Sequence, residues 1–386
     1  MPVSPAMAED LAAAVAMLYE DAERSILERL SRALAEGIDS PLWAEIKLRS
    51  IGDLRQAVEE VTDALQQDAD GAVRQALIEA YGRGRQAAVA ELGALDIGRE
   101  LQARRVLPGA PAVDRLAASY AADTRPVYAR VTRAVVDVYR RIVTRVASGP
   151  LLGTVTRRQA SQRALDAFAQ RGVGGFIDRA GKTWELAAYA EMAVRSVTAR
   201  AAIEGHIDAL AEIQVGLVMV SDAPLECPLC RPWEGEILTL SDRSGPHTLR
   251  MEDLDPPEQP RRGLLRRRGS APTVAVHVAG SLVEARAAGL FHPNCRHSLS
   301  AYLPGVTTRP PHHATPGTSY EDTQRQREIE RHIRAWKRRQ VAAMDDAARQ
   351  RAGAYVRKWQ KAAREHVVAH SDLRRKPQRE QIGAAR

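Results

Sequence analysis

The sequence has 386 residues, enough for two or three domains with at least one sizeable core. Aromatic residues make up only 4% of it and alanine is abundant, which favours long helices with small side chains at their contacts over a β-sandwich or barrel. No run of eighteen apolar residues and no basic-then-apolar leader occurs, so we expect a soluble protein without a membrane span, made in a cytoplasm.

The formal net charge of +8 is unevenly distributed along the chain. From Val306 to Arg386 there are 19 Lys and Arg residues against 9 Asp and Glu, a net charge of +10, which leaves −2 for residues 1–305. This split predicts a basic tail, and it predicts that a polyanionic partner meets the protein there.

Apolar residues at helical spacing predict three helices near the start of the chain. The first covers residues 5–31, and the second starts at Pro41 and carries a short coiled-coil-like seam. A third is expected to end at Gly82 and Gly84.

A cluster of helix breakers at residues 105–112 is the first expected joint, and a further helix is predicted from Pro126 to Ser148. Nothing before it groups a nucleophile, a base and oxyanion donors. Residues 1–150 therefore predict a helical assembly module without a catalytic site.

Residues 151–305 predict a small mixed α/β module, because short apolar runs bounded by glycine appear here. We expect a hairpin across residues 176–186, helices over 187–211 and 282–289, strands over 215–220 and 273–278, and an exposed loop over 241–272.

All three cysteines lie in two short stretches of this module. Cys227 and Cys230 form a C-x-x-C pair, while Cys295 and His297 alternate along the later stretch. A C-x-x-C pair turns two thiolates toward one ion, and the later pair can supply the other two corners of a tetrahedron. The pattern predicts a structural zinc site, with His292 as an alternative fourth ligand.

Two other interpretations of the cysteines remain open. Three cysteines cannot all pair within one chain, and a disulfide between Cys227 and Cys230 would close a small, strained ring unless it were a redox motif. Free buried or redox cysteines are therefore one alternative. A catalytic metal is the other, although such a site keeps one position open to water while four good ligands are available here.

The last part of the chain, residues 306–386, is predicted to be a proline-rich linker followed by one long basic helix from Thr318 to about Val368. Its narrow apolar stripe is compatible with a solvated amphipathic helix, with docking on a protein partner, or with nucleic-acid binding. The expected partner-binding residues are Arg331, Arg334, Lys337, Arg338, Arg339, Arg357, Lys358 and Lys361.

Several stretches together resemble one family, the minor capsid protein 2 type of tailed-phage head protein, related to the Mu F-type head morphogenesis proteins. They are residues 181–195, Asp222 with the C-x-x-C pair and Trp233-x-Gly235, residues 289–297, and residues 324–337. Serine at position 196, where the family shows threonine, and the long basic insert between the cysteine stretches depart from the pattern.

The resemblance implies a virion component inside the phage head near the portal, which acts in assembly and in DNA packaging or ejection. Its implied partners are portal, major capsid or scaffold protein, with packaged DNA meeting the tail; there is no membrane partner, and assembly takes place in the host cytoplasm.

We therefore expect a predominantly helical α+β protein in three parts, 1–150, 151–305 and 306–386, that is structural and not an enzyme. The alternative functions are a metal-dependent HNH-like nuclease and a non-specific nucleic-acid-binding protein. A nuclease of that kind needs a histidine base beside a divalent ion, and only Asp222 and His297 qualify. A closed zinc site would use that histidine as a ligand.

Overall fold

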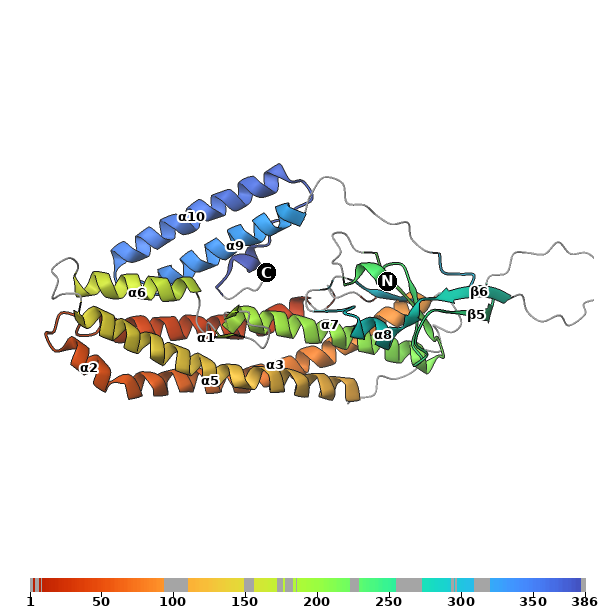
Figure 1. Ribbon diagram of the computed structural model, residues 1–386, viewed down its shortest axis with the longest axis horizontal. Coiled ribbons are helices and arrows are strands. Elements are labelled where there is room, and N and C mark those ends of the chain that lie inside the picture. Colours follow the sequence, from red (N-terminus) through yellow and green to blue (C-terminus); the bar gives the residue numbers. More distant parts are fainter. Residues whose placement is uncertain are drawn as a thin grey trace, which may run out of the picture. The chain divides into compact units, whose positions relative to one another are not determined.

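The computed structural model is predominantly helical, with short strands concentrated in one part of the chain (Figure 1). It describes Val3, Met7 and residues 9–93, 110–148, 156–171, 176–177, 183–184, 186–222, 229–254, 273–292, 295, 297–308 and 320–382. None of the helices in these ranges is long and apolar enough to span a membrane.

The helices are α1 Glu9–Ala35, α2 Trp43–Arg49, α3 Ile51–Leu92, α5 Pro111–Ser148, α6 Arg157–Arg171, α7 Leu186–Glu212, α8 Leu282–Ala287, α9 Tyr320–Val341 and α10 Asp346–Ala369. The strands are β1 Phe176–Ile177, β2 Thr183–Trp184, β3 Leu217–Val220, β4 Ile237–Thr239, β5 His247–Glu252, β6 Thr273–Val278, β7 Gly280–Ser281 and β8 Leu299–Ala301. Two short 3-10 turns, η3 Arg231–Trp233 and η4 Pro377–Glu380, complete the described structure.

The contacts between residues divide the chain into two compact units, each assembled from three separate segments. Unit 1 consists of Met1–Leu11, Ala76–Leu116 and Arg195–Thr315, and unit 2 of Ala12–Gln75, Ala117–Val194 and Pro316–Arg386. Four of the five boundaries fall inside helices, namely α1, α3, α5 and α7. This division by contacts differs from the three consecutive segments expected from composition.

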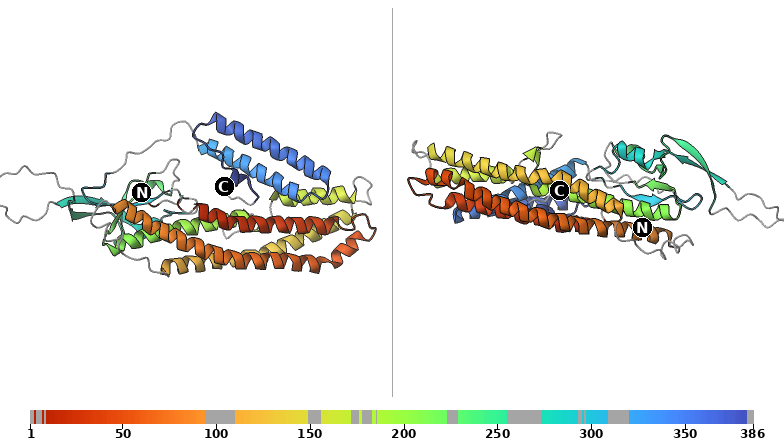
Figure 2. Two further views of the ribbon diagram at one scale, coloured as in Figure 1. Left: turned by 180° about the vertical axis from the view of Figure 1, so that it is seen from behind. Right: turned by 90° about the horizontal axis from the view of Figure 1, so that it is seen from below.

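Unit 2 is a helical bundle in which the segments of α1, α3 and α5 lie side by side (Figure 2). Its core includes a cluster of tyrosines: the hydroxyl of Tyr19 on α1 lies 2.7 Å from that of Tyr120 and 2.6 Å from that of Tyr128, both on α5. Each of these three hydroxyls thus has a hydrogen-bond partner, which offsets the cost of removing it from water.

The tail is a helical hairpin, so the expectation of one long basic helix is wrong. α9 ends at Val341, and α10 starts after Asp345, whose side chain accepts a hydrogen bond from the amide of Ala348 at 2.8 Å and caps the new helix. The narrow apolar stripe is the seam between the two helices, where Ile329 and Ile333 of α9 cluster with Val356 and Ala363 of α10.

Gly82 and Gly84 do not end a helix, as expected from the sequence, but lie within α3. A Cβ added at Gly84 would lie 1.8 Å from the backbone oxygen of Ala202 on α7, and one at Gly205 of α7 would lie 2.1 Å from that of Tyr81 on α3. Within unit 1, the two helices therefore touch backbone to backbone, an approach that only glycine permits at these positions.

Pro126 was expected to begin a helix, but α5 begins at Pro111 and Pro126 lies inside it. A proline inside a helix removes one backbone hydrogen bond. The buried face nevertheless continues across it, from Tyr120 through Val127 to Val131. The predicted end of this helix at Ser148 is confirmed.

Unit 1 contains a four-stranded sheet in the order β7-β4-β3-β8, in which β3 is antiparallel to both β4 and β8. A separate hairpin pairs β5 with β6 over six residues of each strand. The predicted strands β3 and β6, and helices α7 and α8, are confirmed. Part of the expected loop 241–272 is instead strand β5, and residues 255–272 lie outside the described structure.

Candidate metal centre

The sheet explains why two stretches far apart in sequence meet. Val220, the last residue of β3, pairs with Leu299, the first residue of β8. Just beyond this pair the amide of Ser221 donates to the carbonyl of Ser298 at 3.0 Å, and the amide of Ser298 donates to the Ser221 hydroxyl at 2.9 Å. Because the strands are antiparallel, the residues that follow β3 and those that precede β8 lie at one end of the sheet.

Cys230 follows β3, and Cys295 and His297 precede β8, so this end of the sheet brings the three together. The sulfur of Cys230 lies 3.6 Å from that of Cys295, and the Cys295 sulfur lies 3.3 Å from Nδ1 of His297. The three ligand atoms all lie within 4.8 Å of one another. Cys230 and His297 are buried, with exposed fractions of 1% and 2%.

These spacings fit the edges of a zinc tetrahedron. With Zn–S near 2.3 Å and Zn–N near 2.05 Å, tetrahedral angles separate two sulfurs by about 3.8 Å and a sulfur from a nitrogen by about 3.6 Å. The observed separations, 3.6 and 3.3 Å, are a few tenths of an ångström shorter. The donor set present therefore fits a metal that prefers sulfur and nitrogen ligands.

Glu234 holds the histidine from its other side, since its Oε1 lies 2.6 Å from Nε2 of His297. It directly follows η3, the short turn that begins after Cys230 and in which the Trp233 amide donates to the Cys230 carbonyl at 2.9 Å. One turn thus fixes both a thiol ligand and the carboxylate that orients the imidazole, an arrangement typical of metal-bound histidine. The sequence interpretation missed Glu234.

The electrostatics of the cluster favour charged forms. Burial raises the pKa of Cys295, but its hydrogen bonds with His297 and Cys230 outweigh this effect, and the pKa lies below the ordinary thiol value. Burial lowers the pKa of His297, while hydrogen bonds with Cys295 and Glu234 raise it, and the net direction is upward. A thiolate is the form in which cysteine binds metals.

The other two predicted ligands differ in what can be said of them. Cys227 lies outside the described residues. His292 is described and donates its backbone amide to the carbonyl of Gly289 at 3.2 Å, but it does not belong to the group of ligand atoms formed by the other three residues.

The predicted basic residues of the tail fall into three groups. Arg331, Arg357, Lys358 and Lys361 are exposed. Lys337 and Arg339 are half-buried; Lys337 contacts Gln381, and Arg339 lies over the ring of Trp336.

Arg334 and Arg338, the third group, are buried, with exposed fractions of 5% and 1%. Arg338 donates to the carbonyls of Ala169 and Gln170 at the end of α6, at 2.7 and 3.1 Å, and Arg334 donates to the carbonyl of Arg379 at 2.6 Å. Both guanidinium groups therefore hold unit 2 together.

Fold and cluster together define a helix-dominated protein with a small sheet that carries a buried Cys/His centre. The family Phage minor capsid protein 2 matches residues 3–368, nearly the whole sequence, and the chain belongs to this family. The resemblance identified from the sequence is thereby confirmed.

A relative described as "Structural protein", from Lactococcus phage LL-H, is 24% identical over 210 residues, which is 53% of this chain. The chain spans about half the length of that relative, 50% of which is covered. No solved structure matches. Family and relative both indicate a structural protein of a phage.

Proposed function

We propose that this protein is a low-copy component inside the phage head near the portal, acting in assembly and in DNA packaging or ejection. Its partners are portal, major capsid or scaffold protein, which it meets in the host cytoplasm during assembly. Membership of a minor capsid family and the name of the phage relative support this role.

The observation that carries the proposed architecture is the convergence of Cys230, Cys295 and His297 at one end of the sheet. We propose that Cys227 joins them in a structural zinc site. A zinc ion bound here would cross-link residues that follow β3 to residues that precede β8, 65 positions away for Cys230 and Cys295. The bound ion would stabilise the small sheet by holding these two stretches of chain together.

The geometry of His297 supports a structural site over a nuclease. A general base needs a ring nitrogen directed at a water or substrate. Here Nδ1 faces the sulfur of Cys295 and Nε2 faces Glu234, so both nitrogens are engaged. We therefore propose no nuclease activity.

The tail is proposed to meet DNA through its exposed basic residues, Arg331, Arg357, Lys358 and Lys361. Such contact would be weak, independent of sequence and strongly dependent on salt, because phosphate attraction would supply most of the affinity. Trp336 and Trp359 are not part of this surface, since they pack against the seam of the hairpin.

Four measurements test the proposal. Elemental analysis of the purified chain should find one zinc per molecule, and Cys295→Ser should lose the zinc and melt at lower temperature; metal-free protein, or an unchanged melt, would refute the site. Quantitative mass spectrometry of purified virions should find the protein at a copy number far below the major capsid protein, and its absence from virions would refute the structural role. Nicking of supercoiled plasmid with magnesium, manganese or zinc would favour the nuclease instead.

A further inference from the structure

The second half of α5 carries a dense set of arginines. From Thr124 to Ser148 there are six arginines and no lysine, against a single acidic residue, Asp137. All six are exposed. We call them the arginine face of α5: Arg125, Arg130, Arg133, Arg140, Arg141 and Arg145. The net charge of residues 1–305 is close to zero, so this local excess of arginines does not appear in the charge of the long segment.

Most of the arginine face is not neutralised by the chain itself. Arg140 approaches Asp137 at 3.8 Å. Arg125, Arg130, Arg133 and Arg141 make no ion pair or hydrogen bond with any residue in the part of the chain that the structure describes. Some exposed arginines elsewhere in unit 2 do have acidic neighbours one helical turn away, as Arg24 has Asp21 and Arg349 has Asp346.

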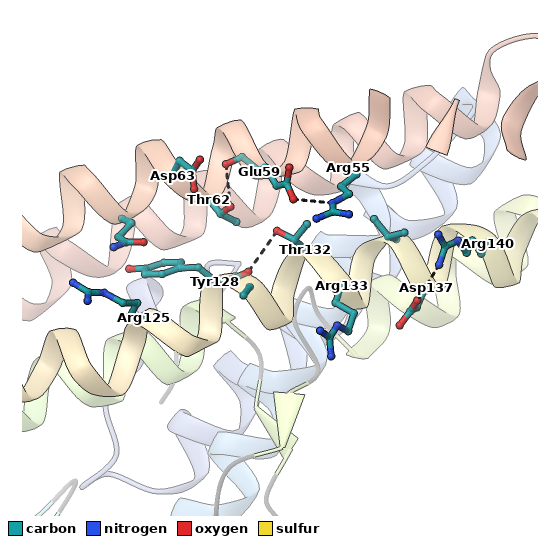
Figure 3. A pocket seen from close by; sticks show the side chains of 13 residues that line it. Arg55, Glu59, Thr62, Asp63, Arg125, Tyr128, Thr132, Arg133, Asp137 and Arg140 are labelled. Atoms are coloured by element: carbon teal, nitrogen blue, oxygen red, sulfur yellow. Dashed lines mark hydrogen bonds and ion pairs between the residues drawn. The ribbon is translucent and has the colours of Figure 1, made fainter. Parts of the chain in front are cut away.

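The neighbouring helix determines which side of this face a ligand can use. α3 and α5 border a groove of about 650 Å³, with Arg125, Arg133, Asp137 and Arg140 on the α5 wall and Arg55, Glu59 and Asp63 on the α3 wall (Figure 3). Arg55 is already paired with Glu59 at 2.8 Å, and the carboxylates of the groove oppose an anion lying in it. Arg130 and Arg141 do not line it, so an anion is better placed on the outer side of α5.

The chemistry of the face favours a phosphate backbone over a protein. Protein interfaces are built around apolar and aromatic anchors that exclude water, and their cores are depleted in charge. None of the large apolar side chains of α5 is among the exposed ones, in a stretch described in full from Pro111 to Val146. Arginine also matches phosphate oxygens with two parallel hydrogen bonds.

The dimensions agree with a duplex. The 21 residues from Arg125 to Arg145 extend over roughly 30 Å of helix at 1.5 Å per residue. Duplex DNA carries a phosphate about every 1.7 Å of its axis, so this length faces a continuous row of charges. No fixed spacing between the arginines is required for binding that does not depend on sequence.

We infer that the arginine face of α5 is a binding surface for the phosphate backbone of duplex DNA, on a bundle helix far from the tail in sequence. It gives unit 2 a DNA contact that does not depend on the proposed tail contact. It extends the proposed role in the head without requiring that role, because the binding can be measured on the purified chain alone.

The test compares full-length variants for binding to a random-sequence duplex over a range of salt concentrations. The test variant is R130Q/R133Q/R141Q. The control R24Q/R49Q/R349Q removes the same charge from arginines that already have acidic neighbours on their own helices. A third variant, R331Q/R357Q/K358Q, removes three charges from the proposed tail contact, and R130K/R133K/R141K restores charge to α5.

Each lost phosphate contact should lower the slope of log affinity against log salt by about 0.9, so the α5 variant should lose between about 2 and 3 in slope. At about 0.1 M salt this corresponds to a fall in affinity on the order of a hundredfold or more. The lysine variant should keep most of the slope, and the control should bind nearly as the unmodified protein does.

Four outcomes would overturn the inference. If the α5 variant kept the affinity and slope of the unmodified chain, the face would not contact DNA; if only the tail variant lost slope, the tail proposal would stand alone. An equal loss in the control would mean that net charge, and not this surface, governs binding. Unchanged DNA binding together with failure of the α5 variant to enter heads would identify an acidic protein partner instead.

Discussion

Replacing Gly84 with alanine should destabilise unit 1, although the same change usually stabilises a helix. The added Cβ would lie 1.8 Å from the oxygen, 2.7 Å from the carbon and 3.0 Å from the Cα of Ala202. These are backbone atoms of α7 and cannot rotate away. Since ordinary carbon–oxygen contact begins near 3.4 Å, the two helices must separate locally by roughly 1.5 Å.

The separation would also stretch the polar contacts on both sides of the crossing. Tyr81 donates to Asp208 at 2.7 Å, and Arg85 reaches Glu212 with two bonds of 2.6 and 2.9 Å. Overpacking against rigid atoms costs up to about 3 kcal/mol, and the better helix propensity of alanine returns about 1 kcal/mol. The expected net loss is therefore about 2 kcal/mol, or a melting temperature lower by roughly 5 °C.

Gly82 provides the matched control, two residues away in the same helix. A Cβ there meets nothing within 4 Å, so Gly82→Ala should stabilise the helix by about 0.5–1 kcal/mol. Far-UV circular dichroism during thermal and urea unfolding of both variants measures the difference. If Gly84→Ala unfolded at the same midpoint as Gly82→Ala, the close approach of α3 and α7 would be wrong.

Three other predictions follow from single side chains. Glu234→Gln should weaken zinc binding roughly 10- to 100-fold in competition with a chromogenic chelator, because Glu234 orients His297, whereas His292→Ala should leave it unchanged. Arg338→Ala should lower the free energy of unfolding by roughly 3 kcal/mol in urea titration, since it leaves two carbonyls of α6 without a charged donor. Arg331 is exposed, so Arg331→Ala should cost almost nothing. Equal losses in the two variants would contradict the role given to Arg338. Burial, together with the nearby Glu191 and Glu23, raises the pKa of Glu20 to about 7 from an ordinary 4.5. Between these two pH values the folded state holds a proton that the unfolded chain releases. The free energy of unfolding should therefore fall as pH rises from 4.5 to about 7. Melts across this range should show a weaker fall in stability for Glu20→Gln than for the unmodified protein, and an equal fall would contradict the raised pKa.

The residues of the Cys/His cluster could be predicted from the sequence because their pattern is local. A C-x-x-C pair and a C-x-H pair have few other uses, and the structure places one member of the first beside both members of the second. Glu234 could not be predicted, because a carboxylate four residues after Cys230 is unremarkable until the sheet brings His297 to it. The available signal was the short Trp-Glu-Gly turn itself.

The helix boundaries were harder to predict, and the reason is that one residue can serve two purposes. Glycine ends many helices, but Gly84 serves instead for contact with a helix more than a hundred residues later, which no local pattern reveals. The break between α9 and α10 carries neither glycine nor proline. Its one local signal is Asp345 as a capping residue.

The interleaved order of the two units has a consequence for how the protein emerges from the ribosome. Unit 2 begins at Ala12 and is completed by Pro316–Arg386, while unit 1 needs segments from Met1 to Thr315. Neither unit has all of its segments during most of translation. At about 5–20 residues per second, the nascent chain therefore stays incompletely folded for tens of seconds.

Until α9 arrives, the carbonyls of α6 lack Arg338, and Ser31 on α1 lacks the Ala342 carbonyl to which it donates at 3.3 Å. Deleting the tail, the obvious way to ask whether a basic extension binds DNA, would therefore leave unit 2 without its last-made segment. It would report on whether the protein folds and stays soluble after synthesis, and point substitutions of exposed residues are needed to report on DNA.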